Sequence, residues 1–392
     1  MQQRSVKNPL PPVLRSRQHL IEHGASFLPK DAAAPITLPI AKDGTTYNMA
    51  QEIAWLDGDH FAVGRWDGSL SVFAFNPSSM EGPLISTAVS SPSTEGVQMV
   101  EWLAPRVFAT SNDEQSISVW RSPSGSWRDL RQAAILQYDP SLGVANSGES
   151  FHIGSKLYLV VGHANGYVTI WSSESSRTDL TLLTTVDVRS AQPVNPWGLH
   201  NVRGVALIRS TNQDAYVVTG SEDGNLCVVH VPDGAILSSR VYSPSAQRGI
   251  NSVATLGQQL LVANCSVGPD DKNLWYYWID PNDWSINVRD SAHLKVNPAA
   301  PQVFNFCTIW GLYNQGLCFF ASTEEGTLWM GTVVNDQSLS IFGYEELTSP
   351  LGSALAFNAC GRLAMVSYDL YEFTTFGGSP PSSSVDPELI IH

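Results

Sequence analysis

Charged residues are scarce in this chain of 392 residues, where Asp, Glu, Lys and Arg together make up 15%, against roughly 25% in an ordinary soluble domain. Basic residues are fewer than acidic ones, with 22 Lys and Arg compared with 36 Asp and Glu. The formal net charge is −14, and no basic run interrupts it. A chain of this charge repels nucleic acid and anionic membranes. We therefore expect neither of them as a partner.

Long hydrophobic runs and paired cysteines are also missing. No apolar stretch approaches the roughly 18 residues of a membrane-spanning helix, and the first twenty residues lack the apolar core of a secretion signal. The five cysteines are odd in number and include no CxxC pair, which favours buried thiols in a reducing compartment. We expect a soluble protein of the cytoplasm, with the nucleus as the alternative location.

Familiar enzyme signatures do not occur in the sequence. It contains no G-x-S-x-G elbow, Walker phosphate loop, dinucleotide fingerprint, HExxH or metal-binding Cys/His spacing. The sequence therefore predicts no cofactor and no metal site.

Short strands joined by tight turns are what the chain has instead. The stretch "VVGHANGYVTIW" at 160–171 places two apolar strands on either side of Asn165-Gly166. This dipeptide is typical of a type I′ hairpin turn, in which both central residues have positive φ. We therefore expect a hairpin with that turn.

Six further stretches follow the same pattern of apolar strand, polar or acidic turn and apolar strand. Their turns succeed one another at intervals of 43 to 58 residues, close to the roughly 40 to 45 residues of a four-stranded propeller blade. Most units have an apolar run before the hairpin and another after it, which completes four strands. The hairpins fall at 61–75, 108–122, 160–171, 216–231, 260–280, 319–333 and 363–376.

These units resemble the WD-repeat family of β-propellers. The resemblance rests on "DGSLSVF" at 67–73, "NGYVTIW" at 165–171, "DGNLCVV" at 223–229 and "SISVW" at 116–120, and it covers about residues 34–376. It implies an all-β fold, a seven-bladed β-propeller of four-stranded antiparallel blades. It also implies that Trp55, Trp102, Trp120 and Trp171 pack in the core.

Members of the family can contain a hydrogen-bonded tetrad of four side chains. These are a His, a Ser or Thr, the Asp of the turn and a Trp. His200, Ser221 and Asp223 match its first three positions, whereas Val229 stands in place of the Trp. We expect His163 and Asp223, both at blade turns, to complete local hydrogen-bond networks rather than bind a ligand.

The two ends predict how the ring closes. The last hairpin is followed only by a Gly/Pro/Ser-rich tail, so its blade lacks an outer strand, and "PITLPI" at 35–40 can supply one. Closure by both termini removes open sheet edges. We expect a partly flexible N-terminal extension at 1–33, the propeller at 34–376 and a flexible tail at 377–392.

Acidic residues and one histidine on the predicted innermost strands are the candidates for chemistry. In propeller enzymes such residues surround the central channel, so Glu52, Glu101, Glu149 and His152 would be the acids or bases of an enzyme or the contacts of a small-ligand site. The alternative is that they face solvent or bond to neighbouring backbone. We expect the alternative, and therefore no catalytic residue.

Elaborated loops on one face are the candidates for binding. The connection at 189–200, "RSAQPVNPWGLH", contains Trp197, and a second long connection lies at 291–302. Loops on one face of a rigid scaffold commonly bind partners, and a loop aromatic is a suitable anchor. We expect a non-catalytic scaffold, monomeric as a propeller within a hetero-complex, that binds a protein or peptide partner on blades 3 to 6. The predicted partner-binding residues are Asn195, Trp197, His200, Lys295 and Asn297.

Overall fold

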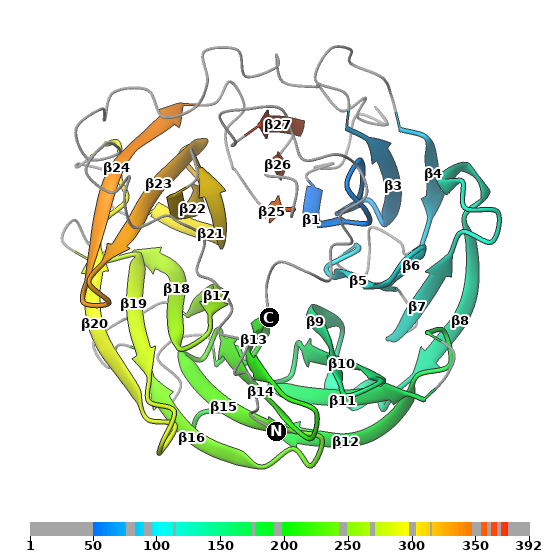
Figure 1. Ribbon diagram of the computed structural model, residues 1–392, viewed down its shortest axis with the longest axis horizontal. Helices are drawn as coiled ribbons and strands as arrows, with labels where there is room; N and C mark the ends of the chain where they lie inside the picture. The colour runs from blue at the N-terminus through cyan, green and yellow to red at the C-terminus, as the bar shows by residue number, and fades with distance from the viewer. Residues whose placement is uncertain are drawn as a thin grey trace, which may run out of the picture.

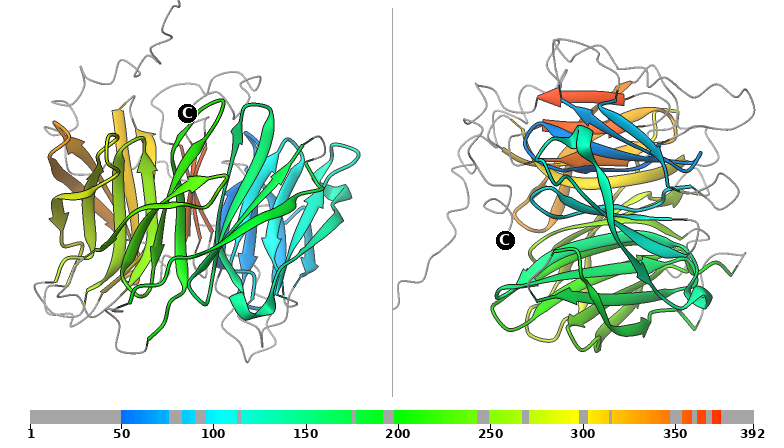
Figure 2. Two further views of the ribbon diagram at one scale, coloured as in Figure 1. Left: turned by 90° about the horizontal axis from the view of Figure 1, so that it is seen from below. Right: turned by 90° about the vertical axis from the view of Figure 1, so that its right-hand side faces the viewer.

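The strands of the chain are arranged in a ring of small antiparallel sheets (Figure 1). Seen from the side, the sheets stand next to one another around the ring (Figure 2). The structure is a computed structural model. It describes residues 50–75, 83–89, 96–112, 115–174, 177–191, 198–242, 249–266, 271–297, 303–313, 316–346, 354–358, 362–366 and 370–374.

Six sheets have four strands each, and we call these sheets blades 1 to 6. Within each blade the strands are given in order from the innermost to the outermost. Blade 1 contains β1 (Ala50–Trp55), β2 (His60–Arg65), β3 (Ser69–Ala74) and β4 (Ile85–Ala88). Blade 2 contains β5 (Val100–Ala104), β6 (Val107–Ser111), β7 (Ser116–Arg121) and β8 (Arg131–Gln137). Blade 3 contains β9 (Ala145–Ile153), β10 (Lys156–His163), β11 (Tyr167–Ser173) and β12 (Thr181–Asp187).

The second half of the ring repeats this order. Blade 4 contains β13 (Val202–Ser210), β14 (Ala215–Ser221), β15 (Asn225–Val231) and β16 (Ile236–Val241). Blade 5 contains β17 (Ile250–Leu256), β18 (Gln259–Ser266), β19 (Leu274–Ile279) and β20 (Ile286–Ala292). Blade 6 contains β21 (Val303–Tyr313), β22 (Gly316–Thr323), β23 (Thr327–Val334) and β24 (Ser338–Glu346), and β18 also pairs briefly with β21.

The last sheet has three described strands, β25 (Ala354–Phe357), β26 (Arg362–Val366) and β27 (Leu370–Thr374). Every hairpin expected from the sequence is an antiparallel pair. Segments 1–33, 35–40 and 377–392 lie outside the described residues. Closure by an N-terminal strand, and with it a seventh complete blade, therefore stays a prediction.

Contacts between the first and last sheets nevertheless join the two ends of the ring on its inner side. Trp55 Nε1 donates to Ala356 O at 3.0 Å, and Asn358 Nδ2 donates to Gly58 O at 3.2 Å. Trp102 Nε1 in turn donates to Leu56 O at 3.1 Å, which links blade 2 to blade 1.

The hydrophobic core is divided into clusters that each lie between two neighbouring sheets. Trp171 is 3% exposed between blades 2 and 3, and Trp120 is 7% exposed between blades 1 and 2, as the sequence predicted. Trp55 and Trp102 are half-buried. Successive side chains of a strand point to opposite faces of its blade, so each blade packs against both of its neighbours.

The expected type I′ turn at Asn165-Gly166 is wrong. Only Gly166 has a positive φ, of 80°, and its N–H donates to His163 O at 3.3 Å. The turn is therefore one residue longer than expected, with Ala164 and Asn165 in the centre and the left-handed glycine after them. A loop of this length also matches the twist of the two strands.

No α-helix occurs within the ranges listed above, only the short 3-10 helices η3 (Trp127–Asp129) and η4 (Pro140–Leu142). Accordingly, that part of the chain contains no helix of the length and apolarity needed to cross a membrane. Four cysteines lie in that part of the chain, and they form no disulfide with one another: Cys227, Cys265, Cys307 and Cys318.

Candidate functional site

One end of the ring carries the elaborated connections. Antiparallel order places the second-to-third strand turns, and the connections from one blade to the next, at the same end of the sheets. We call this end the loop face. In blades 3 to 6 it includes the connections at 188–201, 267–273 and 293–302.

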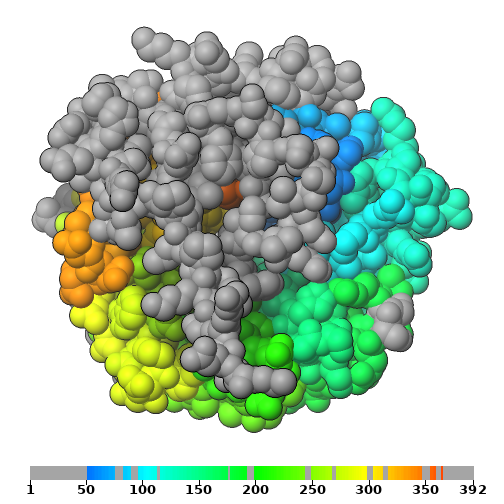
Figure 3. Space-filling view, in the orientation of Figure 1, coloured from blue at the N-terminus to red at the C-terminus, as the bar shows by residue number. Residues whose placement is uncertain are grey.

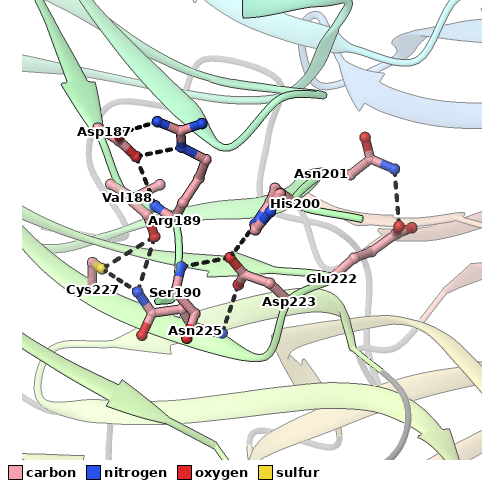
Figure 4. A network of polar contacts seen from close by, with 10 residues as sticks. All are labelled: Asp187, Val188, Arg189, Ser190, His200, Asn201, Glu222, Asp223, Asn225 and Cys227. Carbon is pink, nitrogen blue, oxygen red and sulfur yellow. Dashed lines mark hydrogen bonds and ion pairs between the residues drawn. The ribbon is translucent and has the colours of Figure 1, made fainter. Parts of the chain in front are cut away.

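A buried carboxylate fixes the first of these connections (Figure 4). Asp223, in the β14–β15 turn, is fully buried, and its Oδ2 accepts from Ser190 N at 2.7 Å and lies 2.8 Å from His200 Nδ1. Its Oδ1 accepts from Asn225 N at 2.9 Å. Asn225 Nδ2 in turn donates to Val188 O at 2.9 Å. The turn of blade 4 therefore holds both described ends of the β12–β13 connection.

The same arrangement recurs two blades later. Glu325, in the β22–β23 turn of blade 6, accepts from Val296 N at 2.8 Å and from Asn297 N at 3.2 Å. Asn273 exchanges hydrogen bonds with Leu294, of 2.7 Å and 3.0 Å. Turn side chains thus hold the β20–β21 connection in a fixed conformation.

The five predicted partner-binding residues differ in exposure, and the structure describes three of them. His200 has a 27% exposed side chain beside the buried Asp223, Asn297 is exposed, and Lys295 is 9% exposed. All three lie on the loop face. Asn195 and Trp197 lie outside the described residues, so their role stays a prediction.

The tetrad expected in blade 4 is incomplete. His200 bonds to Asp223, but Ser221 Oγ is buried with no hydrogen-bond partner within the described ranges. Val229 stands in place of the Trp, and Asp223 instead reaches the third strand through Asn225 N. His163 and Asp223 both complete local networks, as expected.

Blade 3 builds a related chain from different positions. His163 Nε2 lies 2.8 Å from Thr169 Oγ1, which accepts from Trp171 Nε1 at 2.9 Å. Burial lowers the pKa of His163 to about 4, so the ring is neutral at physiological pH. This network ties the hairpin turn to the core tryptophan.

Three of the candidate residues for chemistry do come together on the innermost strands. The carboxyls of Glu52, Glu101 and Glu149 are partly buried. Burial raises the pKa of Glu52 to about 7 and that of Glu149 to about 8. Burial, and then the charges of Glu149 and Glu52, raise the pKa of Glu101 well above its usual range. Burial therefore favours the protonated form of all three carboxyls.

Each of these carboxyls also bonds to strand backbone. Glu52 Oε1 accepts from Ile53 N at 3.0 Å, and Glu101 Oε1 accepts from Ser150 N of the next blade at 2.9 Å. Glu149 accepts from the Leu207 backbone N–H of blade 4. Glu101 and Glu149 thus link neighbouring blades, whereas Glu52 bonds within its own strand.

His152, the fourth candidate, contacts groups outside the three carboxyls. Its Nε2 lies against Arg177 Nη1, and its backbone oxygen accepts from Ser210 Oγ. In the described part of the chain, no group of three or more His, Cys, Asp or Glu side chains is placed to hold a metal ion.

Sequence reasoning missed a polar bridge at the loop-face end of the innermost strands. Arg203 of β13 pairs with Glu222 at 2.8 Å, and its Nη1 also donates to Gln98 Oε1 at 3.3 Å. Because Gln98 precedes β5, this bond reaches from blade 4 past blade 3 to blade 2. No local pattern could indicate a contact between residues 105 positions apart.

Comparison with known proteins identifies the architecture. No protein-family model matches the chain. In structure, it resembles the β-propeller domain of Cps50 (Swd1) from Myceliophteria thermophila, with a TM-score of 0.57 and 12% identity over 84% of this chain and 98% of that one. It also resembles the WD40 β-propeller domain of Doa1, with a TM-score of 0.58 and 13% identity over 86% of this chain and 95% of that one. The chain has the β-propeller fold.

A relative found by sequence agrees with this fold. The propeller is 22% identical over 265 residues to the tRNA (34-2'-O)-methyltransferase regulator WDR6 of Mus musculus. The match covers 62% of the propeller chain and 20% of the mouse protein. The chain therefore spans about a fifth of the length of that relative.

The raised pKa values predict how the stability of the propeller depends on pH. Since folding raises the pKa of Glu149 from 4.5 to about 8, the folded state binds a proton that the unfolded state releases between these values. The free energy of unfolding should therefore fall by on the order of 4 kcal/mol as the pH rises from 5 to 9. Urea denaturation at each pH measures this change.

A Glu149→Gln variant, which cannot ionise, should show a clearly smaller fall and be more stable than the wild type at pH 9. Glu174→Gln is the matched control, because Glu174 is 73% exposed and pairs with Lys156 at the surface. Equal pH dependence of wild type and Glu149→Gln would contradict the prediction.

Proposed function

We propose that this chain is a non-catalytic protein-interaction scaffold, a subunit of a larger complex that binds a protein or peptide partner through the loop face of blades 3 to 6. The observation that carries the proposal is the fixing of two loop-face connections by Asp223 and Glu325 of the following turns. Loops held in one conformation lose little entropy on binding. Because the same fold serves many functions, the function of a propeller has to be inferred from such a surface and not from the fold.

Two further observations support a scaffold. The mouse relative is named as the regulator of an enzyme, and the acidic net charge of −14 disfavours nucleic acid and anionic membranes as partners. Cysteines that form no disulfide with one another, as in the described part of the chain, are typical of a reducing compartment. We therefore propose a cytoplasmic or nuclear hetero-complex that contains one copy of the propeller.

A double variant tests the binding face. Trp197→Ala combined with Asn297→Ala should weaken capture of the partner roughly thirtyfold, because a loop aromatic of this kind commonly contributes about 2 kcal/mol. The thermal midpoint should stay near the wild-type value, since exposed loop residues contribute little to folding. Affinity of purified protein for the co-purified partner is the measurement.

Trp66→Ala is the matched control, because Trp66 is a 37% exposed tryptophan on the same face but in the β2–β3 turn of blade 1. It should leave capture unchanged. Undiminished capture by the folded double variant would move the interface away from blades 3 to 6.

An enzyme or small-ligand-binding protein that uses the innermost strands is the second candidate. The observation in its favour is the group of Glu52, Glu101 and Glu149, whose pKa values are raised toward neutrality, as is common at acid–base sites. A turnover that Glu149→Gln abolishes while partner capture is unchanged would favour this candidate over the scaffold.

A further inference from the structure

The outer edge of blade 3 lies at the circumference of the ring and presents backbone groups there. β12 is the edge strand of its sheet, and no described strand pairs with its outer side. Val188 N donates inward to Gly166 O at 3.0 Å. Because strand N–H groups alternate in direction, Thr184 and Val186 also point inward. The backbone N–H groups of Thr185 and Asp187 therefore point outward.

β12 has little of the protection that proteins usually give to an exposed edge, which is charge, proline or a very short strand. Its sequence, TLLTTVD, has no charged residue before Asp187, and Asp187 is already paired with Arg189. Leu182 and Leu183 are 36% and 46% exposed.

Most outer strands of the other four-stranded blades are better protected. β4 has only four residues. Among the longer strands, β16 and β20 carry charged residues inside the strand and β24 carries two at its end, whereas β8, like β12, carries one charged residue at one end. These residues are Arg131 in β8, Arg240 in β16, Arg289 and Asp290 in β20, and Glu345 and Glu346 in β24.

The neighbouring blade extends the apolar surface beside this edge. An added Cβ at Gly234, in the β15–β16 turn, would lie 2.7 Å from Val186 Cγ2, so this turn packs directly against β12. Ile236 and Leu237 follow the turn and are 44% and 37% exposed. We call the four exposed residues Leu182, Leu183, Ile236 and Leu237 the apolar rim. This part of the ring is the green outer region at the lower edge of the molecule (Figure 3).

We propose that β12 is a second binding surface, which adds an extended strand of a partner protein to blade 3 by backbone hydrogen bonds. The outward groups of Thr185 and Asp187 would pair with the added strand, and the apolar rim would contact its apolar side chains. The occupant is a segment with alternating apolar residues and basic residues at its ends. Its basic charge complements a chain of net charge −14, whereas two copies of this chain repel each other.

The probe for this surface is a synthetic heptapeptide with lysine at each end and alternating threonine and valine between them. Titration calorimetry with the full chain should detect its binding. The same peptide with N-methyl groups on alternate residues cannot complete the backbone ladder and should bind at least tenfold more weakly. A version with glutamate at both ends should also bind more weakly.

Thr185→Pro removes one outward N–H and keeps every inward bond of β12, because proline is tolerated at an edge strand. It should weaken binding of the peptide roughly tenfold or more, with Thr185→Ala as the matched control that retains both the N–H and the affinity. Thermal denaturation of each variant confirms that it is folded.

Several results would overturn the proposal: no binding of the lysine-ended peptide to the wild type, equal binding by Thr185→Pro, or equal binding of the N-methylated peptide. Sedimentation velocity tests the other occupant. A wild-type dimer that Thr185→Pro converts to monomer would show that a second copy, not a partner strand, covers β12.

Discussion

Replacing Trp171 with alanine is expected to lower the free energy of unfolding by about 3 to 5 kcal/mol, the usual cost of removing a buried aromatic residue. The indole is 3% exposed in the cluster between blades 2 and 3. Its loss removes apolar contacts from both blades and leaves a cavity between two rigid sheets. It also leaves Thr169 Oγ1 without the Trp171 Nε1 donor at 2.9 Å. Urea denaturation followed by circular dichroism measures the change.

Trp66→Ala is the control for this experiment as well. Its side chain is 37% exposed in a surface turn, so the substitution should change the free energy of unfolding by no more than about 0.5 kcal/mol. A loss below about 1 kcal/mol for Trp171→Ala would mean that the indole does not pack between the blades.

Replacing Asp223 with alanine is expected to cost about 3 kcal/mol, because it removes a buried acceptor and leaves its donors unpaired. Three groups lose their partner: Ser190 N, Asn225 N and His200 Nδ1. Hydrogen exchange should also become faster at the amide of Ser190, since that end of the β12–β13 connection is no longer held. Denaturation and exchange measured by mass spectrometry check the two effects.

Asp233→Ala is the matched control for Asp223→Ala. Asp233 also caps a turn and pairs with a histidine, His230, at 2.7 Å, but its side chain is 60% exposed. Its removal should cost less than about 1 kcal/mol. Equal losses for the two variants would show that the burial of Asp223 is not what fixes the loop face.

The blade pattern could be predicted because it depends on contacts between neighbours in the sequence. A hairpin such as β10–β11 needs only alternating apolar residues and a turn glycine, and its repetition predicts the propeller. The turn type was predicted wrongly at Asn165-Gly166, because the dipeptide fits both a two-residue loop and the longer loop that the structure has. Which loop forms depends on the pairing register of the whole strands.

The site could be predicted only in part, because its bonds join distant residues. His200 and Asp223 match family positions and were found from the sequence. Glu325 was missed, because its bonds to Val296 and Asn297 cross 28 or more residues and leave no periodic signal. The hydrogen bond from Arg203 to Gln98 could not be predicted for the same reason, because it joins residues that are 105 positions apart.

Cross-linking of the purified complex with a lysine-specific reagent tests the proposed binding face most directly, because lysines are few and well placed. Lys272 is exposed in the β18–β19 connection of the loop face, whereas Lys156 begins β10 at the opposite end of the ring and is 44% exposed. A partner seated on blades 3 to 6 should cross-link to Lys272 and not to Lys156. Cross-links at Lys156, with none at Lys272, would contradict the account.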